Sequence, residues 1–247
     1  MGAGSTLETR KRQLQYLEAM GIQAWDLRNS AIEPLAVEQG VAEVAGMGAS
    51  PADIPGQSAV SGFDWETLRA RVKVCTLCDL HTSRTQSVFG VGNRNADWLL
   101  IGEAPGRDED QQGEPFVGRA GQLLNAMLQA IGLQREQVYI ANILKCRPPN
   151  NRDPRPEEVV CCEPYLMRQI ELIQPRLILA LGRIAAQNLL NTETPIGQLR
   201  GRVHQFRDTG IPLIATYHPA YLLRSPVEKR KAWQDLQLAV ETLQEQV

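Results

Sequence analysis

Four cysteines have a spacing typical of a metal site. Cys75 and Cys78 have two residues between them, and Cys146 and Cys162 follow later in the chain. Thiolates at such positions bind a soft metal ion or an iron–sulfur cluster, and both zinc and [4Fe–4S] clusters accept four cysteine ligands. The spacing alone leaves these two alternatives open. The odd total of five cysteines, with Cys161 as the fifth, favours ligation over disulfide bonds in a chain without a signal-peptide pattern.

A second group of side chains could act on a substrate. Glu103 lies in segment 102–106, whose two glycines permit a tight turn with backbone N–H groups facing a ligand. Phe116 stands in a Gly/Pro-rich loop, where it could fill the core or offer a face for stacking. The amide of Asn142 is both donor and acceptor, and the imidazole of His218 can donate to a developing negative charge.

Alternating strands and helices must position these residues. Apolar runs predict four buried strands, and helical patterns follow them; the strands are 98–101, 138–143, 177–181 and 213–216, and the helices 121–131, 156–173, 184–191 and 228–245. The alternation predicts a three-layer α/β/α sandwich with a central four-stranded parallel sheet. Because ligands bind beyond the carboxyl ends of such strands, the motifs that follow them should converge on one edge of the sheet.

The rest of the chain differs in composition. Residues 6–29 have helical periodicity, and residues 30–63 are rich in Ala, Gly, Pro and Ser, so we expect an N-terminal segment 1–29, a flexible tether 30–63 and a folded domain 64–247. No run of 18 apolar residues occurs, so a cytoplasmic protein without a membrane span is expected. The formal net charge of −2 neither supports nor excludes DNA binding, since a local basic rim would suffice.

Five motifs in order resemble the family 4, iron–sulfur uracil-DNA glycosylases from about Cys75 to the C-terminus. Besides the cysteines they are Gly-Glu-Ala-Pro-Gly at 102–106, Pro-Phe-Val-Gly-Arg-Ala-Gly at 115–121, Asn142 with Lys-Cys-Arg-Pro-Pro at 145–149, and His-Pro-Ala-Tyr-Leu-Leu at 218–223. The resemblance implies a uracil-DNA glycosylase-like fold and hydrolysis of the N-glycosidic bond of deoxyuridine in DNA. Uracil would be released and an abasic site left. It also implies a [4Fe–4S] cluster on Cys75, Cys78, Cys146 and Cys162, with Cys161 as the spare.

The same resemblance implies roles for the residues at the carboxyl edge of the predicted sheet. Phe116 would stack on a flipped uracil, Asn142 would pair with its N3–H and O4, and His218 would donate to its O2 as the bond breaks. Ala104 stands where related families have a water-activating Asp, so Glu103 is expected to position water or the sugar. Further implied substrate contacts are Gly102, Pro105, Gly106 and Glu109, with Glu109 excluding thymine. Implied DNA contacts are Arg119, Leu222, Leu223 and Arg224, one of the two leucines acting as a wedge.

The sequence leaves two alternative functions open and suggests one protein partner. A non-catalytic zinc module with four cysteine ligands that binds nucleic acid, or a DNA glycosylase of broader base specificity, would share some of these features. The substrate is expected to be uracil-containing DNA, single- or double-stranded, and the protein a monomer. Residues 12–28 also resemble the N-terminal peptide of the psi subunit of the bacterial clamp loader. Residues 6–29 are therefore either a docking peptide for replication proteins or a helix that packs on the domain.

Overall fold

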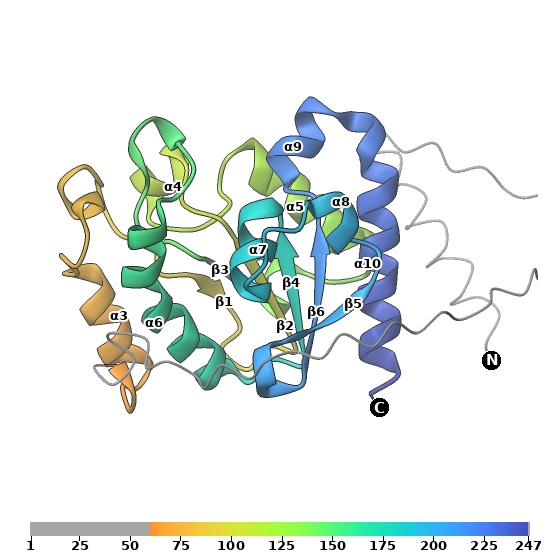
Figure 1. The fold of residues 1–247 in the computed structure, drawn as a ribbon, viewed down its shortest axis with the longest axis horizontal. Coiled ribbons are helices and arrows are strands. Elements are labelled where there is room, and N and C mark those ends of the chain that lie inside the picture. Colours follow the sequence, from red (N-terminus) through yellow and green to blue (C-terminus); the bar gives the residue numbers. More distant parts are fainter. Residues whose placement is uncertain (1–59, 247) are drawn as a thin grey trace, which may run out of the picture.

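The computed structural model describes residues 60–246, whose centre is a six-stranded sheet (Figure 1). Its strand order is β1-β3-β2-β4-β6-β5. The four central strands are mutually parallel and confirm the predicted ones: β2 (Trp98–Gly102), β3 (Tyr139–Asn142), β4 (Leu177–Leu181) and β6 (Ile211–Thr216). Every residue of β2, β3 and β4 is buried, which explains their continuous apolar runs.

Two antiparallel edge strands were not predicted. They are β1 (Val91–Gly92), which pairs with β3, and β5 (Val203–Phe206), which pairs with β6. β1 has only two residues, and β5 is largely exposed and polar, so neither carries an apolar run. Their pairing depends on the neighbouring strand and leaves little signal in the local sequence.

Helices cover both faces of the sheet, as the sandwich prediction requires (Figure 1). On one face α6 (Pro156–Ile173) and α7 (Arg183–Leu190) pack on Leu99, Ile101 and Ala180. On the other, α5 (Arg119–Ala130) and α10 (Lys229–Gln244) pack on Leu100, Leu179 and Ile214. Alternate residues of each strand thus point to opposite helical layers. These four helices match the predicted ones within two residues at each end.

Smaller elements surround this core. α3 (Trp65–Lys73) begins at Asp64, whose Oδ1 accepts a hydrogen bond of 2.8 Å from the Thr67 N–H. Its Leu68 and Val72 pack with Val60 and with Tyr165 of α6. The remaining helices among residues 60–246 are α4 (Arg107–Gln112), α8 (Ile196–Leu199) and α9 (Pro219–Arg224), with 3₁₀ turns η1 (Asp79–Thr82), η2 (Arg135–Gln137), η3 (Pro149–Asn151), η4 (Arg207–Thr209) and η5 (Pro226–Glu228). None of the helices between residues 60 and 246 has the length and apolar character to cross a bilayer.

The register of the parallel strands fixes where the site motifs meet. Gly102 lies opposite Asn142, and Leu181 lies opposite Thr216, so the residues that follow these strands share one edge. Residues 6–29 and most of the predicted tether 30–63 lie outside the described residues.

Candidate active site

A cavity of about 410 Å³ opens at the carboxyl edge of the parallel strands. It brings together most of the predicted site residues: Glu103, Ala104, Pro105, Gly106, Glu109, Phe116, Asn142, His218 and Arg224. The cavity is further lined by Ala120, Pro148, Ala220 and Tyr221 of the quoted motifs and by Asn151, Arg152 and Asp153, which lie outside them. The convergence that the strand order predicts is therefore present.

Asn142, the last residue of β3, is the most deeply buried polar group of the cavity wall. It is 2% exposed, and its Oδ1 has no hydrogen-bond partner within the described chain. Leaving a buried polar atom unpaired costs about 1–3 kcal/mol, so such an atom calls for a ligand. A Cβ on Gly102, the residue opposite, would lie 2.5 Å from this Oδ1. Gly102 therefore lies behind the amide and provides room for it, without lining the cavity.

Phe116 forms another wall of the cavity. Its backbone is left-handed, with φ of 53°, and its ring centroid lies 5.5 Å from that of His218. A Cβ on Gly121, in the first turns of α5, would lie 1.7 Å from the Phe116 carbonyl oxygen, so the loop fits closely against the helix. A residue held in this uncommon conformation by its surroundings is typical of a functional loop.

Glu109 holds two loops of the cavity together. One carboxylate oxygen accepts from the Gly106 N–H at 3.1 Å, and the other accepts from the Val117 and Gly118 N–H groups at 3.0 and 3.3 Å. The side chain thereby ties the turn after β2 to the loop that carries Phe116. The predicted role of Glu109 in excluding thymine stays a prediction, to which the structure adds this positioning role.

His218 follows β6 and caps the N-terminus of α9. Its Nδ1 accepts a hydrogen bond of 3.1 Å from the Ala220 N–H, so the neutral ring carries its proton on Nε2. Removal of the ring from water lowers the pKa of His218 to about 4, and the positive charge of Arg224 contributes to this shift. At neutral pH the residue is therefore an uncharged hydrogen-bond donor.

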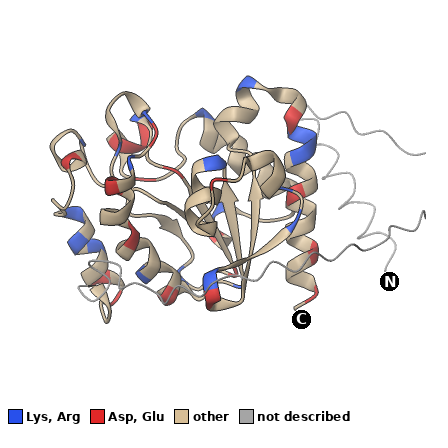
Figure 2. Cartoon of the chain, viewed as in Figure 1, with Lys and Arg blue, Asp and Glu red and all other residues tan. Residues whose placement is uncertain are grey.

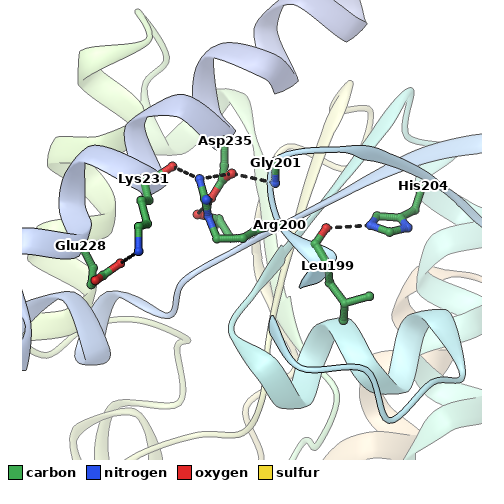
Figure 3. A network of polar contacts seen from close by, with 8 residues as sticks. Leu199, Arg200, Gly201, His204, Glu228, Lys231 and Asp235 are labelled. Carbon is green, nitrogen blue, oxygen red and sulfur yellow. Dashed lines mark hydrogen bonds and ion pairs between the residues drawn. The ribbon is translucent and has the colours of Figure 1, made fainter. Parts of the chain in front are cut away.

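A buried ion pair anchors the strand that leads to His218 (Figure 3). Asp235 of α10 is fully buried and accepts from Nη2 and Nε of Arg200, at 2.8 and 3.1 Å, and from the Gly201 N–H at 3.0 Å. The same carboxylate accepts from the hydroxyl of Thr216, the last residue of β6, at 2.8 Å. These contacts join α10, the segment before β5 and the end of β6 just ahead of His218.

Glu103 lies beside a charged pair contributed by two other segments. Burial raises the pKa of Glu103 to about 7, the negative charge of Asp153 contributes to the rise, and Arg183 opposes it. Asp153 and Arg183 form an ion pair of 2.7 Å at the surface. A carboxyl group that titrates near neutral pH is suited to exchange protons with water.

The predicted DNA contacts are only partly brought to the cavity. Arg224 lines it, whereas Arg119 is exposed at the start of α5 and does not. Leu222 is 1% exposed and belongs to the core beneath α9, packed with α5 and α10. The structure therefore argues against Leu222 as the wedge, because that face of α9 points inward. Leu223 is only partly buried, and its role as the wedge stays a prediction.

The segment 148–153 extends the quoted motif 145–149 into the wall of the cavity. It contains η3, and Asn150 and Asn151 have positive φ values of 56° and 53°. This turn places Asp153 in the wall of the cavity near Glu103. The run Pro148-Pro149-Asn150-Asn151 is a turn signal in the sequence, but the partner of that turn is not visible there.

The four predicted ligand cysteines line one small cavity between α3, the loop after β3 and α6. Cys75, Cys146 and Cys162 are buried, and Cys146 Sγ accepts a hydrogen bond of 2.9 Å from Arg84. Cys161 reaches the same cavity, but its Sγ donates to the Leu77 carbonyl at 3.2 Å. In the part of the chain described, no three His, Cys, Asp or Glu side chains are placed to hold a single metal ion.

An α/β/α sandwich with a cavity beyond its strand ends is typical of ligand-binding and catalytic α/β proteins, and sequence comparisons identify the family. A model of the uracil DNA glycosylase superfamily matches residues 89–237. The type-4 uracil-DNA glycosylase of Archaeoglobus fulgidus is 56% identical over 158 residues, which cover 62% of this chain and 79% of that protein. The type-4 enzyme of Thermotoga maritima is 47% identical over 161 residues, with 65% and 83% covered.

A more distant relative is the type-5 uracil-DNA glycosylase of Thermus thermophilus, 34% identical over 153 residues, which cover 53% of this chain and 68% of that protein. The chain belongs to the uracil DNA glycosylase superfamily and, within it, to the type-4 uracil-DNA glycosylases.

Proposed function

We propose that this protein hydrolyses the N-glycosidic bond of deoxyuridine in DNA, releases uracil and leaves an abasic site, as the first step of base excision repair in the cytoplasm. The observation that carries the proposal is the buried amide of Asn142, whose Oδ1 lacks a partner among the described residues, in a cavity also lined by Phe116 and His218. A flipped uracil would supply that partner through its N3–H.

Base recognition follows from the chemistry of the amide. Asn142 would accept from N3–H and donate to O4 of uracil at once, whereas cytosine presents the opposite pattern at both positions. A wrong base would leave buried polar groups unpaired, and this discriminates strongly. Phe116 would provide the face on which the flipped ring stacks.

Bond cleavage would place negative charge on the departing uracil. His218 would donate a hydrogen bond from its Nε2–H to O2 of the base, and the hydrogen bond from the Ala220 N–H to Nδ1 keeps the ring in the required tautomer. Because Ala104 offers no carboxylate, the reaction is expected to be largely dissociative. Glu103 would then position and deprotonate the water that attacks the sugar.

The direct test measures release of uracil from a single-stranded oligonucleotide by the wild-type protein and by Asn142→Ala. We expect Asn142→Ala to lose most activity and its base selectivity without a fall in melting temperature, because the residue reads the base and its buried Oδ1 has no hydrogen-bond partner among the described residues. Near-wild-type cleavage by this variant would refute the assigned role. Parallel substrates that contain thymine or hypoxanthine distinguish a strict uracil enzyme from one of broader specificity.

We further propose that Cys75, Cys78, Cys146 and Cys162 hold a [4Fe–4S] cluster. The chemistry of the site fits: these thiols come from three segments around one cavity, with the guanidinium of Arg84 beside Cys146. When bound, the cluster would cross-link α3, the loop after β3 and α6.

The proposed contact of residues 6–29 with the clamp loader concerns a segment outside the described residues, and packing of this segment on the domain is the alternative. Deletion of residues 2–55 distinguishes the two, because it retains Val60, which is buried against α3. A docking peptide predicts unchanged uracil excision on short oligonucleotides and loss of replication proteins from a pulldown, which Trp25→Ala should also weaken. Loss of excision on deletion would favour packing.

A further inference from the structure

A second cavity, of about 700 Å³, lies near the edge strand β1 and has no place in the function described above. Residues from α3, from segment 81–94, from the end of α4 and from the start of β3 line it. We call it the α3 groove, and its lining residues used below are Trp65, Arg69, Lys73, Arg84, Arg94, Gln112 and Glu114.

One face of α3 forms a wall of the α3 groove. Trp65, Arg69 and Lys73 follow each other at intervals of four residues, so their side chains share one side of the helix. Leu68 and Val72 lie on the adjoining face, where they are buried in a cluster against which Trp65 also packs. Both cations are exposed, and neither forms an ion pair with any residue between 60 and 246. Figure 2 shows basic residues grouped on this helix.

Two further cations of the groove are already held in place. The Arg94 guanidinium lies 5.4 Å from the centroid of the Trp65 ring and pairs with Glu66 at 2.8 Å. Arg84 donates to Cys146 Sγ and to the Lys73 carbonyl. Glu114 is the acidic residue among the lining side chains. The groove is thus positively charged, and Arg69 and Lys73 remain available for an anionic ligand.

The groove lies close to the candidate active site. Glu109 on α4 lines the active-site cavity, whereas Gln112 at the end of the same helix lines the α3 groove. Six helical residues span about 9 Å, so α4 separates the two cavities by a short distance. Phe116 follows Glu114 by two residues and connects them along the chain. A DNA strand with its target nucleotide in the active site could reach the groove within a few nucleotides.

We propose that the α3 groove binds the phosphates of the substrate strand beside the target nucleotide, with Arg69 and Lys73 as the contacts. This proposal rests on the proposed function, since it needs DNA as the substrate. Lys and Arg side chains bind phosphates irrespective of base sequence, so the groove would add affinity and orientation without affecting base choice.

The experiment compares two uracil-containing single-stranded oligonucleotides, one of about five nucleotides and one of about 25, the latter extended on both sides. Dissociation constants are measured at several salt concentrations for the full chain, for Arg69→Glu, for Lys73→Glu and for the double variant. Arg202→Glu is the matched control. It makes the same change in charge at an exposed residue on the opposite edge of the sheet.

We expect each groove variant to bind the long oligonucleotide several-fold more weakly than Arg202→Glu does. The slope of log affinity against log salt should fall by about 0.7 per lost phosphate contact on a single strand. Binding of the short oligonucleotide should be weakened less, because it offers fewer phosphates to the groove, and the single-turnover rate at saturating protein should stay unchanged. Equal affinity and slope in the double variant and in Arg202→Glu would overturn the proposal. Lack of uracil release by the wild-type protein from the long oligonucleotide would instead count against the proposed function.

Discussion

The pH dependence of the reaction tests the role assigned to Glu103. With a pKa of about 7, its carboxyl group is about 10% ionised at pH 6 and about 90% ionised at pH 8. If only the ionised carboxylate supports the chemical step, the single-turnover rate should rise about tenfold over this interval. His218, with a pKa of about 4, stays neutral throughout and contributes no change. The slope thus reports on Glu103.

The variant Glu103→Gln should have a low rate with little pH dependence between pH 6 and 8. Two neighbouring changes serve as controls: Asp153→Asn should move the wild-type midpoint to lower pH, and Arg183→Gln should move it to higher pH, since each removes one charge beside the carboxyl group. Single-turnover measurements with protein in excess keep binding and product release out of the rate. An identical tenfold rise in Glu103→Gln would refute the reasoning.

The raised pKa of Glu103 also affects the stability of the fold. The folded state holds the Glu103 proton more tightly than the unfolded chain, in which the pKa of this residue is near 4.5. Glu103 therefore lowers the free energy of unfolding as pH rises from about 4.5 through 7. A change of the pKa from 4.5 to about 7 corresponds to about 3 kcal/mol, and partial exposure reduces it to about 1–2 kcal/mol. Glu103→Gln should therefore be more stable than wild type at pH 8 by about this amount, and equally stable at pH 4. Chemical denaturation at both pH values measures the difference.

Three further predictions follow from the geometry. Gly102→Ala should cut uracil excision by at least about tenfold and lower the melting temperature, because its Cβ would lie 2.5 Å from Asn142 Oδ1 and 2.7 Å from the Phe116 ring and displace both; an unchanged rate would contradict the packing argument. His218→Ala should lower the single-turnover rate by about 10²–10³ and leave DNA affinity nearly unchanged, and a rate within a few-fold of wild type would remove its role as the donor. Cys162→Ser should reduce the iron content and the melting temperature whereas Cys161→Ser should do neither, as iron analysis of the purified proteins can show; the reverse pattern would exchange the two ligand assignments.

The sequence by itself determined the core of the sheet and the composition of the site. Continuous apolar runs mark strands buried on both faces, and helical periodicity marks the layers above and below, because both patterns reflect burial along a short stretch of chain. The parallel order then brings Asn142 and His218 to one edge. The sequence pattern does not tell whether Asn142 and His218 stabilise turns or bind a substrate. The resemblance to a family favoured the substrate site, and the family is confirmed.

Only the tertiary structure decided which segments meet around those residues. Asp153 lies beside Glu103, and Asp235 anchors the strand before His218, although these partners are far apart in sequence. Leu222 and Leu223 are adjacent and chemically identical, yet the packing of α9 buries one more deeply than the other. The α3 groove likewise requires α3, α4 and β1 to be neighbours. Local patterns record how much of a residue is buried, whereas its partners depend on the packing of distant segments, which no local pattern encodes.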